Sequence, residues 1–222
     1  MKKEIKRKFL PSICMLSAFV LWTLLICFVD VQAIGPQETK VGFATVNRFV
    51  HNLTGVNMYL YTITDWLSII PIVIVIGFGV LGLIQWIKRK CISRVDYSIL
   101  VLGGFYTVVM AVYVFFETVA VNYRPILING CTEASYPSST TTLVMCVMPT
   151  AHMQFNSRIK NENLKRCVVF AAFAFIAFMV IGRLVSGVHW LTDIIGGALL
   201  SAGLVLMYRA IVSLKEERDV TP

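Results

Sequence analysis

The chain has 222 residues, of which 57% are hydrophobic and 14% are charged. Soluble domains contain about 45–50% apolar and about 25% charged residues, so this composition excludes an ordinary soluble globule and indicates an integral membrane protein. The formal net charge of +8 does not indicate a nucleic-acid-binding protein, because the cations separate apolar runs instead of clustering on one soluble face. The six cysteines include no CxxC pair, which argues against a metal site or a disulfide framework.

The first apolar run predicts a membrane span. Residues 1–8 carry five cations, and residues 9–29 follow as an apolar stretch of about 20 residues, which is long enough to cross a bilayer. A basic start before an apolar core is also typical of a secretory signal, but Val31-Gln32-Ala33 is a weak cleavage pattern. We therefore expect a retained first span, with a cleaved signal as the alternative.

Residues 32–64 are more polar and predict a helix that lies on the membrane surface. Apolar side chains recur there at helical spacing, at Phe43, Val46, Phe49, Val50, Leu53 and Val56. Further apolar runs predict spans near residues 66–87, 97–121, 140–155, 167–181 and 190–214. The predicted fold is an all-α polytopic membrane helical bundle. It has six transmembrane helices, with an outer interfacial helix between the first two, in a single domain over residues 1–222.

The distribution of Lys and Arg predicts the orientation of this bundle. With the N-terminus inside, 16 of the 20 cations lie in cytoplasmic segments, and only Lys40, Arg48, Arg124 and Arg183 remain outside. The positive-inside rule therefore places both termini in the cytoplasm of a bacterial-type cell membrane. The polar stretches around Arg124 and Arg183 are then expected on the outer side.

The stretch from Gly182 to Asp193 is the strongest candidate for chemistry, because it places charge at the edge of two apolar runs. On a helix, His189 and Asp193 are an i, i+4 pair with about 6 Å of axial rise between them. A carboxylate that holds one ring nitrogen as N–H leaves the other nitrogen as a free lone pair. Arg183 supplies a fork of donors suited to phosphate oxygens. A polar cluster that caps helices at the membrane surface is the alternative.

Three stretches on the predicted outer side, Arg124-Pro125, Tyr136 to Thr140 and Gly182 to Asp193, together resemble the type 2 phosphatidic acid phosphatase superfamily. That family's signatures are Lys-x6-Arg-Pro, Pro-Ser-Gly-His and Ser-Arg-x5-His-x3-Asp, and their order and spacing are kept over residues 117–193. The resemblance implies that His189 is the nucleophile and that Asp193 orients it. It also implies that the phosphate is bound by Arg124, Arg183 and a turn before a helix at Ser138, Ser139 and Thr140.

Three positions depart from the family's pattern: Glu117 replaces the first lysine, Thr140 the histidine, and Gly182 the serine. The family's histidine protonates the leaving alkoxide, and losing such an acid costs about 10²–10⁴-fold in rate, or less for a good leaving group such as a pyrophosphate ester. Desolvation near the membrane edge favours a neutral carboxyl, so Glu117 is a candidate proton donor in place of Thr140. The alternative is an ion pair from Glu117 to Arg124 or Arg183 in an inactive site.

From the resemblance we expect a phosphatase that hydrolyses a lipid phosphate or pyrophosphate at the outer membrane face through a phosphohistidine. Its partners are then the lipid substrate and the bilayer, and no nucleic acid, metal or cofactor is expected. Candidate substrates are phosphatidic acid, phosphatidylglycerol phosphate and polyprenyl pyrophosphate. The alternatives are a protein that binds or carries anionic lipid phosphates without catalysis, and a phosphotransferase that uses an acceptor other than water.

Overall fold

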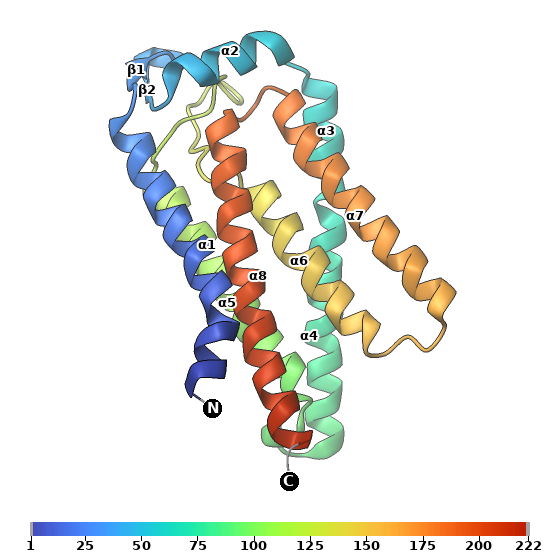
Figure 1. The fold of residues 1–222 in the computed structure, drawn as a ribbon. Helices are drawn as coiled ribbons and strands as arrows, with labels where there is room; N and C mark the ends of the chain where they lie inside the picture. Colours follow the sequence, from blue (N-terminus) through green and yellow to red (C-terminus); the bar gives the residue numbers. More distant parts are fainter. Residues whose placement is uncertain (1, 221–222) are drawn as a thin grey trace.

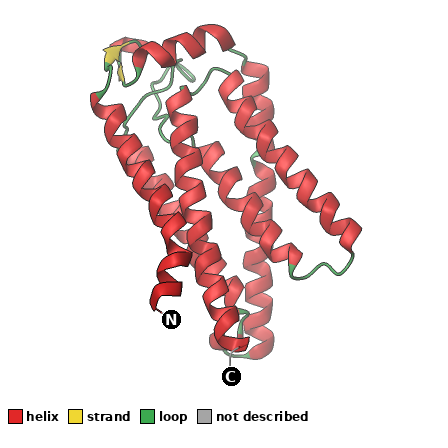
Figure 2. Cartoon of the chain, viewed as in Figure 1, coloured by secondary structure: helices red, strands yellow, loops and turns green. Residues whose placement is uncertain are grey.

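The computed structural model of the chain describes residues 2–220, and most of them are helical (Figure 1, Figure 2). The long helices are α1 (Lys2–Phe28), α4 (Ile69–Arg89), α5 (Tyr97–Thr118), α6 (Ser139–Asn156), α7 (Glu162–Val185) and α8 (Leu191–Val220). The connections contain α2 (Ala44–Thr54), α3 (Met58–Leu67) and the 3₁₀ turns η1 (Pro36–Glu38) and η2 (Ile92–Arg94). The strands β1 (Gln32–Ala33) and β2 (Lys40–Val41) pair in antiparallel fashion.

Five helical segments within residues 2–220 are long and apolar enough to cross a membrane: Ile5–Phe28, Met58–Arg89, Tyr97–Thr118, Glu162–Val185 and Leu191–Lys215. The chain is therefore an all-α polytopic membrane protein, as predicted. The remaining predicted span, the fourth in the chain at residues 140–155, corresponds to α6, which does not meet this criterion. Its buried residues include Thr140, Thr141, Thr142, Thr150 and Gln154. These polar groups are tolerated because α4, α5, α7 and α8 all pack against α6.

The second span begins earlier than predicted, because α3 precedes α4 with only Ser68 between them. The break lies one turn before Pro71, whose ring crowds the carbonyl four residues earlier and which has no N–H to donate. The apolar run near residue 66 therefore begins in a separate short helix, α3, that precedes α4. This helix packs against α7, close to the candidate site.

The predicted surface helix corresponds to α2, and its polar side faces the bundle. Asn47 is fully buried, and its Nδ2 donates to the Gly42 carbonyl at 2.9 Å and to Thr192 Oγ1 at 3.0 Å. The apolar side chains Phe49 and Leu53 are 63% and 71% exposed. A helix with its apolar face turned away from the protein is suited to lying at the membrane interface.

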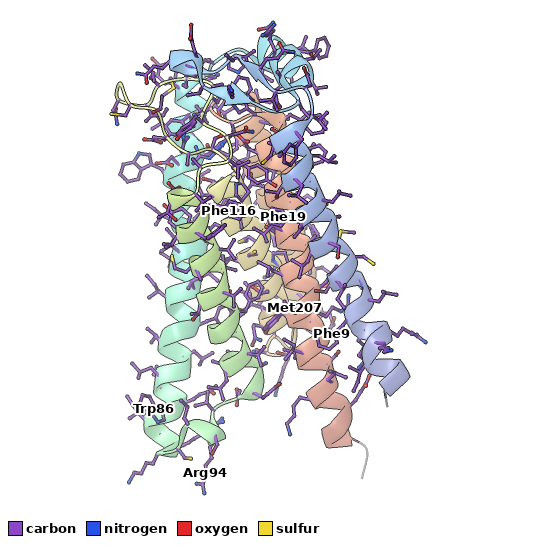
Figure 3. The ribbon with its side chains drawn as sticks, turned by 90° about the vertical axis from the view of Figure 1, so that its left-hand side faces the viewer. Phe9, Phe19, Trp86, Arg94, Phe116 and Met207 are labelled. Carbon is purple, nitrogen blue, oxygen red and sulfur yellow. The ribbon has the colours of Figure 1, made fainter. Side chains whose placement is uncertain are left out.

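The small residues of α8 allow close helix packing. A Cβ atom at Gly203 would lie 2.7 Å from the side chain of Leu16 on α1, and one at Gly197 would lie 3.2 Å from the Ser138 carbonyl oxygen at the start of α6. Above this contact, Phe116 of α5 packs against both Phe19 of α1 and Tyr136, with ring centroids 5.8 Å apart in each pair. Figure 3 shows Phe19 and Phe116 pointing toward one another below the α2 end of the bundle. These rings support the loop that carries Tyr136.

The described ends of the chain lie together at one end of the bundle, with the α4–α5 and α6–α7 connections (Figure 1). The opposite end carries α2, the loop over residues 119–138 and the turn between α7 and α8. All three stretches of the family resemblance therefore reach the same end of the molecule.

Candidate functional site

The loop over residues 119–138 joins the first two signature stretches by folding back on itself. The backbone N–H of Arg124 donates to the Glu133 carbonyl at 3.0 Å, and that of Ser135 donates to the Asn122 carbonyl at 2.9 Å. This pairing places Arg124 close to the Tyr136 to Thr140 stretch, although 11 residues separate Arg124 from Ser135 in the sequence.

Arg124 and Arg183 meet at the ring of Tyr61 on α3. The guanidinium carbon of Arg183 lies 4.9 Å from the ring centroid, and that of Arg124 lies 5.9 Å from it. Both distances are within the range of a cation–π contact. One arginine comes from the 119–138 loop and the other from the last turn of α7, so the fold gathers the two cations as the resemblance requires.

Each arginine also has a carboxylate partner. Arg124 Nε lies 3.0 Å from Glu133 Oε2, and Arg183 Nη2 donates to Asp65 Oδ1 at 2.9 Å. Glu117, for which an ion pair was the alternative, is exposed at the end of α5, and its carboxylate lies in neither of these pairs. The role of Glu117 as a proton donor stays a prediction.

Several buried side-chain nitrogens in this region have no hydrogen-bond partner among the described residues. They are Nε and Nη1 of Arg183, Nη1 of Arg124, and both ring nitrogens of His189. Arg183 and His189 are only 2% and 3% exposed. A buried charged donor without an acceptor is costly, and an anion with several oxygens is the ligand that satisfies convergent donors.

His189 lies in the turn between α7 and α8, two residues before α8 begins, so it and Asp193 do not form the predicted i, i+4 pair on one helix. Its Nδ1 lies 3.7 Å from Asp193 Oδ2, which is beyond hydrogen-bond distance. The same Oδ2 accepts the backbone N–H of Trp190 at 2.9 Å, so Asp193 also caps the start of α8. The carboxylate therefore faces the imidazole from a fixed position. The capping role proposed as the alternative is present in the structure, and the orienting role of Asp193 stays a prediction.

Burial determines the ionisation of His189. Desolvation lowers the pKa of the imidazole, and the neighbouring Arg124 and Arg183 lower it further, while Asp193 acts in the opposite direction. Because the net shift is downward, the ring is neutral at physiological pH. A neutral imidazole with a free lone pair is the form that can attack phosphorus.

Glycine at position 187 is required by the turn that carries His189. Its φ is +69°, and a Cβ atom there would lie 1.9 Å from the Gly55 carbonyl oxygen. Next to it, the Asn57 N–H donates to the Ser186 carbonyl at 3.0 Å. The segment before α3 thus holds the α7–α8 turn directly.

The three residues predicted to form a phosphate-binding turn lie at the start of α6. Ser138 is the N-cap of α6, where its Oγ accepts the Thr141 N–H at 3.4 Å and its own N–H donates to the Asp193 carbonyl at 3.1 Å. Ser139 and Thr140 are the first residues of the helix, where backbone N–H groups have no partner within the helix. The hydroxyl of Thr140 contacts Arg183 Nη2. The positive end of the α6 dipole therefore adds to the attraction for an anion.

A cavity of about 820 Å³ contains this site. Its polar lining includes Arg124, Thr140, Arg183 and His189, and Glu117 lies on its wall. Toward the membrane it is lined by apolar side chains of α4, α5 and α6, including Ile72, Val109, Phe116 and Val147. A polar head at one end and an apolar tail at the other is the arrangement that a lipid phosphate needs.

Sequence reasoning missed three residues of this site: Tyr61, Asp65 and Glu133. The omission of Asp65 was avoidable, because it is the one carboxylate between Glu38 and Asp96 and stands beside an apolar run. Tyr61 and Glu133 have no such signal, since their roles depend on contacts between distant segments.

Comparison with known proteins places these features in a wider context. The family profile described as PAP2 superfamily matches residues 109–216, which include all three signature stretches. The structure resembles that of a transmembrane PAP2-type phosphatidylglycerolphosphate phosphatase from Bacillus subtilis, with a TM-score of 0.60 and 16% sequence identity, over 91% of this chain and 96% of that one. No curated protein matches the sequence.

Proposed function

Because the chain belongs to the PAP2 superfamily, we propose that it is a membrane phosphatase that removes the phosphoryl group of a lipid phosphate or pyrophosphate at the outer membrane face. One observation supports this proposal above the others. The buried Arg183, the partly buried Arg124 and a neutral histidine gather around one polar pocket, and their unpartnered nitrogens line a cavity that continues between apolar helix faces.

In the proposed reaction, the Asp193 carboxylate faces Nδ1 of His189, and the phosphoryl group approaches the other ring nitrogen, Nε2. The Nε2–P bond forms as the bond from phosphorus to the leaving oxygen breaks, and the leaving oxygen takes up a proton. Water then attacks phosphorus, the N–P bond breaks, and inorganic phosphate leaves. Arg124, Arg183 and the amides at the start of α6 stabilise the charge on the phosphoryl oxygens in both steps.

The apolar half of the cavity supports a lipid as the substrate. A water-soluble phosphate ester has no apolar chain to place against the side chains of α4, α5 and α6, whereas the chains of a lipid can pass from the bilayer onto these apolar faces without entering water. Phosphatidic acid, phosphatidylglycerol phosphate and polyprenyl pyrophosphate share this chemistry. The substrate named for the Bacillus subtilis protein is one of them.

A role in binding lipid phosphates without catalysis is the second candidate, and a specific observation favours it. Arg124 and Arg183 are each paired with a carboxylate, and Thr140 cannot act as the family's acid. Such a site could hold an anion and still turn it over slowly.

The test is phosphate release from detergent-purified protein offered the three lipid classes, with and without an added alcohol acceptor. We expect His189→Ala to lower release by about 10³-fold or more, as loss of a nucleophile does in other enzymes. A phosphohistidine should be trapped in the native protein and not in this variant. Equal, near-zero release by both proteins would leave the binding role, and release that depends on the alcohol would indicate a transferase.

A further inference from the structure

Asp65 lies in the last turn of α3, outside the three signature stretches, and yet it reaches the centre of the site. Its Oδ1 accepts a hydrogen bond of 2.9 Å from Arg183 Nη2. The same nitrogen contacts the hydroxyl of Thr140, which stands where the family resemblance expects the acidic histidine. The carboxylate is therefore separated from the position of the missing acid by a single shared donor.

The other carboxylates of the cavity region are placed differently. Glu133 pairs with Arg124 on the loop, and Asp193 is fully buried with its oxygens directed at the Trp190 N–H and Asn122. Glu117 is exposed on the cavity wall, and its carboxylate lies in neither of the two arginine pairs of the site. Among the described residues, Asp65 is the carboxylate that meets Arg183 and the Thr140 position together.

We infer that Asp65 is the catalytic proton donor to the leaving oxygen, an inference that rests on the phosphatase activity proposed above. In the structure Asp65 is the counter-ion of Arg183. A phosphoryl group that binds Arg183 would compete with Asp65 for the guanidinium donors and leave the Asp65 carboxyl facing the substrate. The Asp65 side chain is 57% exposed, so a proton can reach it from water.

The proton balance over the two steps is complete. As the His189 Nε2–P bond forms and the P–O bond breaks, the carboxyl proton of Asp65 moves to the leaving oxygen. The Asp65 carboxylate then accepts a proton from the water that attacks the phosphohistidine. Inorganic phosphate leaves, and the carboxyl is ready for the next substrate. This assignment explains how a site with Thr140 in place of histidine can act on a poor leaving group.

The experiment compares leaving groups. Asp65→Asn keeps the size of the side chain and an oxygen for Arg183 but has no proton to transfer. We expect it to lower kcat/KM for phosphatidic acid by about 10²–10⁴-fold, the usual contribution of a general acid. With p-nitrophenyl phosphate, whose leaving group departs without a proton, the loss should stay below about tenfold. Asp65→Glu should recover part of the activity on phosphatidic acid, and it keeps the test open if Asp65→Asn folds poorly.

Glu133→Gln is the matched control, because it removes the carboxylate that pairs with the other arginine in the same site. Glu133→Gln should change kcat/KM for both substrates by the same factor. Equal losses for both substrates in Asp65→Asn would overturn the inference and leave Asp65 as a counter-ion. A leaving-group dependence in Glu117→Gln, and none in Asp65→Asn, would overturn it in favour of Glu117. Absence of a phosphohistidine in the native protein with every substrate would overturn the phosphatase proposal itself, and the inference with it.

Discussion

His189 has to act from an enclosed position, and its protonation state follows from that enclosure. The side chain is 2% exposed, and desolvation is the largest cause that lowers its pKa. Arg124 and Arg183 also lower this pKa, since a positive charge on the imidazole beside the two guanidinium groups is unfavourable. The residues that attract the phosphate therefore also keep the nucleophile uncharged.

The pH profile of the native protein should reflect this shift. The active imidazole is the neutral form, so activity is present above the lowered pKa and is lost as the pH falls through it. We expect the acidic limb of kcat/KM, corrected for ionisation of the substrate phosphate, to lie below pH 6.5, the ordinary value for histidine. An acidic limb at or above pH 6.5 would mean that Asp193 raises the pKa of His189 by more than burial lowers it.

At the scale of elements, α3 determines how the third signature stretch is built in this chain. It packs against the end of α7, and a Cβ atom at Gly182 would lie 2.8 Å from Thr64 Cγ2. Thr64 is fully buried, and its Oγ1 donates to the Leu60 carbonyl at 2.9 Å, which fixes the methyl group in place. Glycine at the position of the family's serine is therefore the consequence of close contact between two helices.

The contact between Gly182 and Thr64 predicts one destabilising substitution and a second substitution that compensates for it. Gly182→Ser should lower the melting temperature, because overpacking of this kind costs about 1–3 kcal/mol, and should also lower activity by moving Arg183. Adding Thr64→Ser removes Cγ2, keeps the hydroxyl bond to Leu60 and should restore both properties. Thr64→Ser alone is the control. If the double variant is no more stable than Gly182→Ser, the glycine has another cause.

At the scale of the whole molecule, the bundle separates the site from the cationic connections. The α4–α5 connection with Lys88, Arg89 and Lys90 lies at the end that holds the described termini, and the 119–138 loop lies at the other end (Figure 1). The positive-inside rule predicts that the 119–138 loop lies outside. Exposed cysteines mark both ends: Cys91 follows α4, and Cys131 lies in that loop.

These two cysteines allow the predicted orientation to be measured. In variants that keep one cysteine each, a membrane-impermeant maleimide should label Cys131 in intact spheroplasts and should label Cys91 only after permeabilisation. The permeabilised sample is the control for thiol reactivity. The reverse pattern would place the site on the cytoplasmic side, and labelling of both thiols in intact spheroplasts would contradict a membrane between them.

The sequence by itself determined the class of the fold, because composition and the length of apolar runs depend on the bilayer and not on contacts between helices. It also located α2, since the spacing of Phe49 and Leu53 is a local property. The number of spans stays a prediction, because α6 falls outside the criterion of length and hydropathy that five segments of residues 2–220 meet, and its buried threonines are accommodated by four neighbouring helices.

Part of the candidate site could likewise be predicted from the sequence, and part depended on the tertiary structure. The spacing of Arg124, Arg183, His189 and Asp193 could be recognised in the sequence, since the signatures lie within short segments. The tertiary structure alone decided which carboxylates meet the arginines, because Asp65 lies 118 residues from Arg183 and no local pattern records that contact. It also decided that His189 precedes α8, since the turn at Gly187 depends on packing against Gly55. Local periodicity determines elements, but pairing between distant segments depends on how the helices pack in three dimensions.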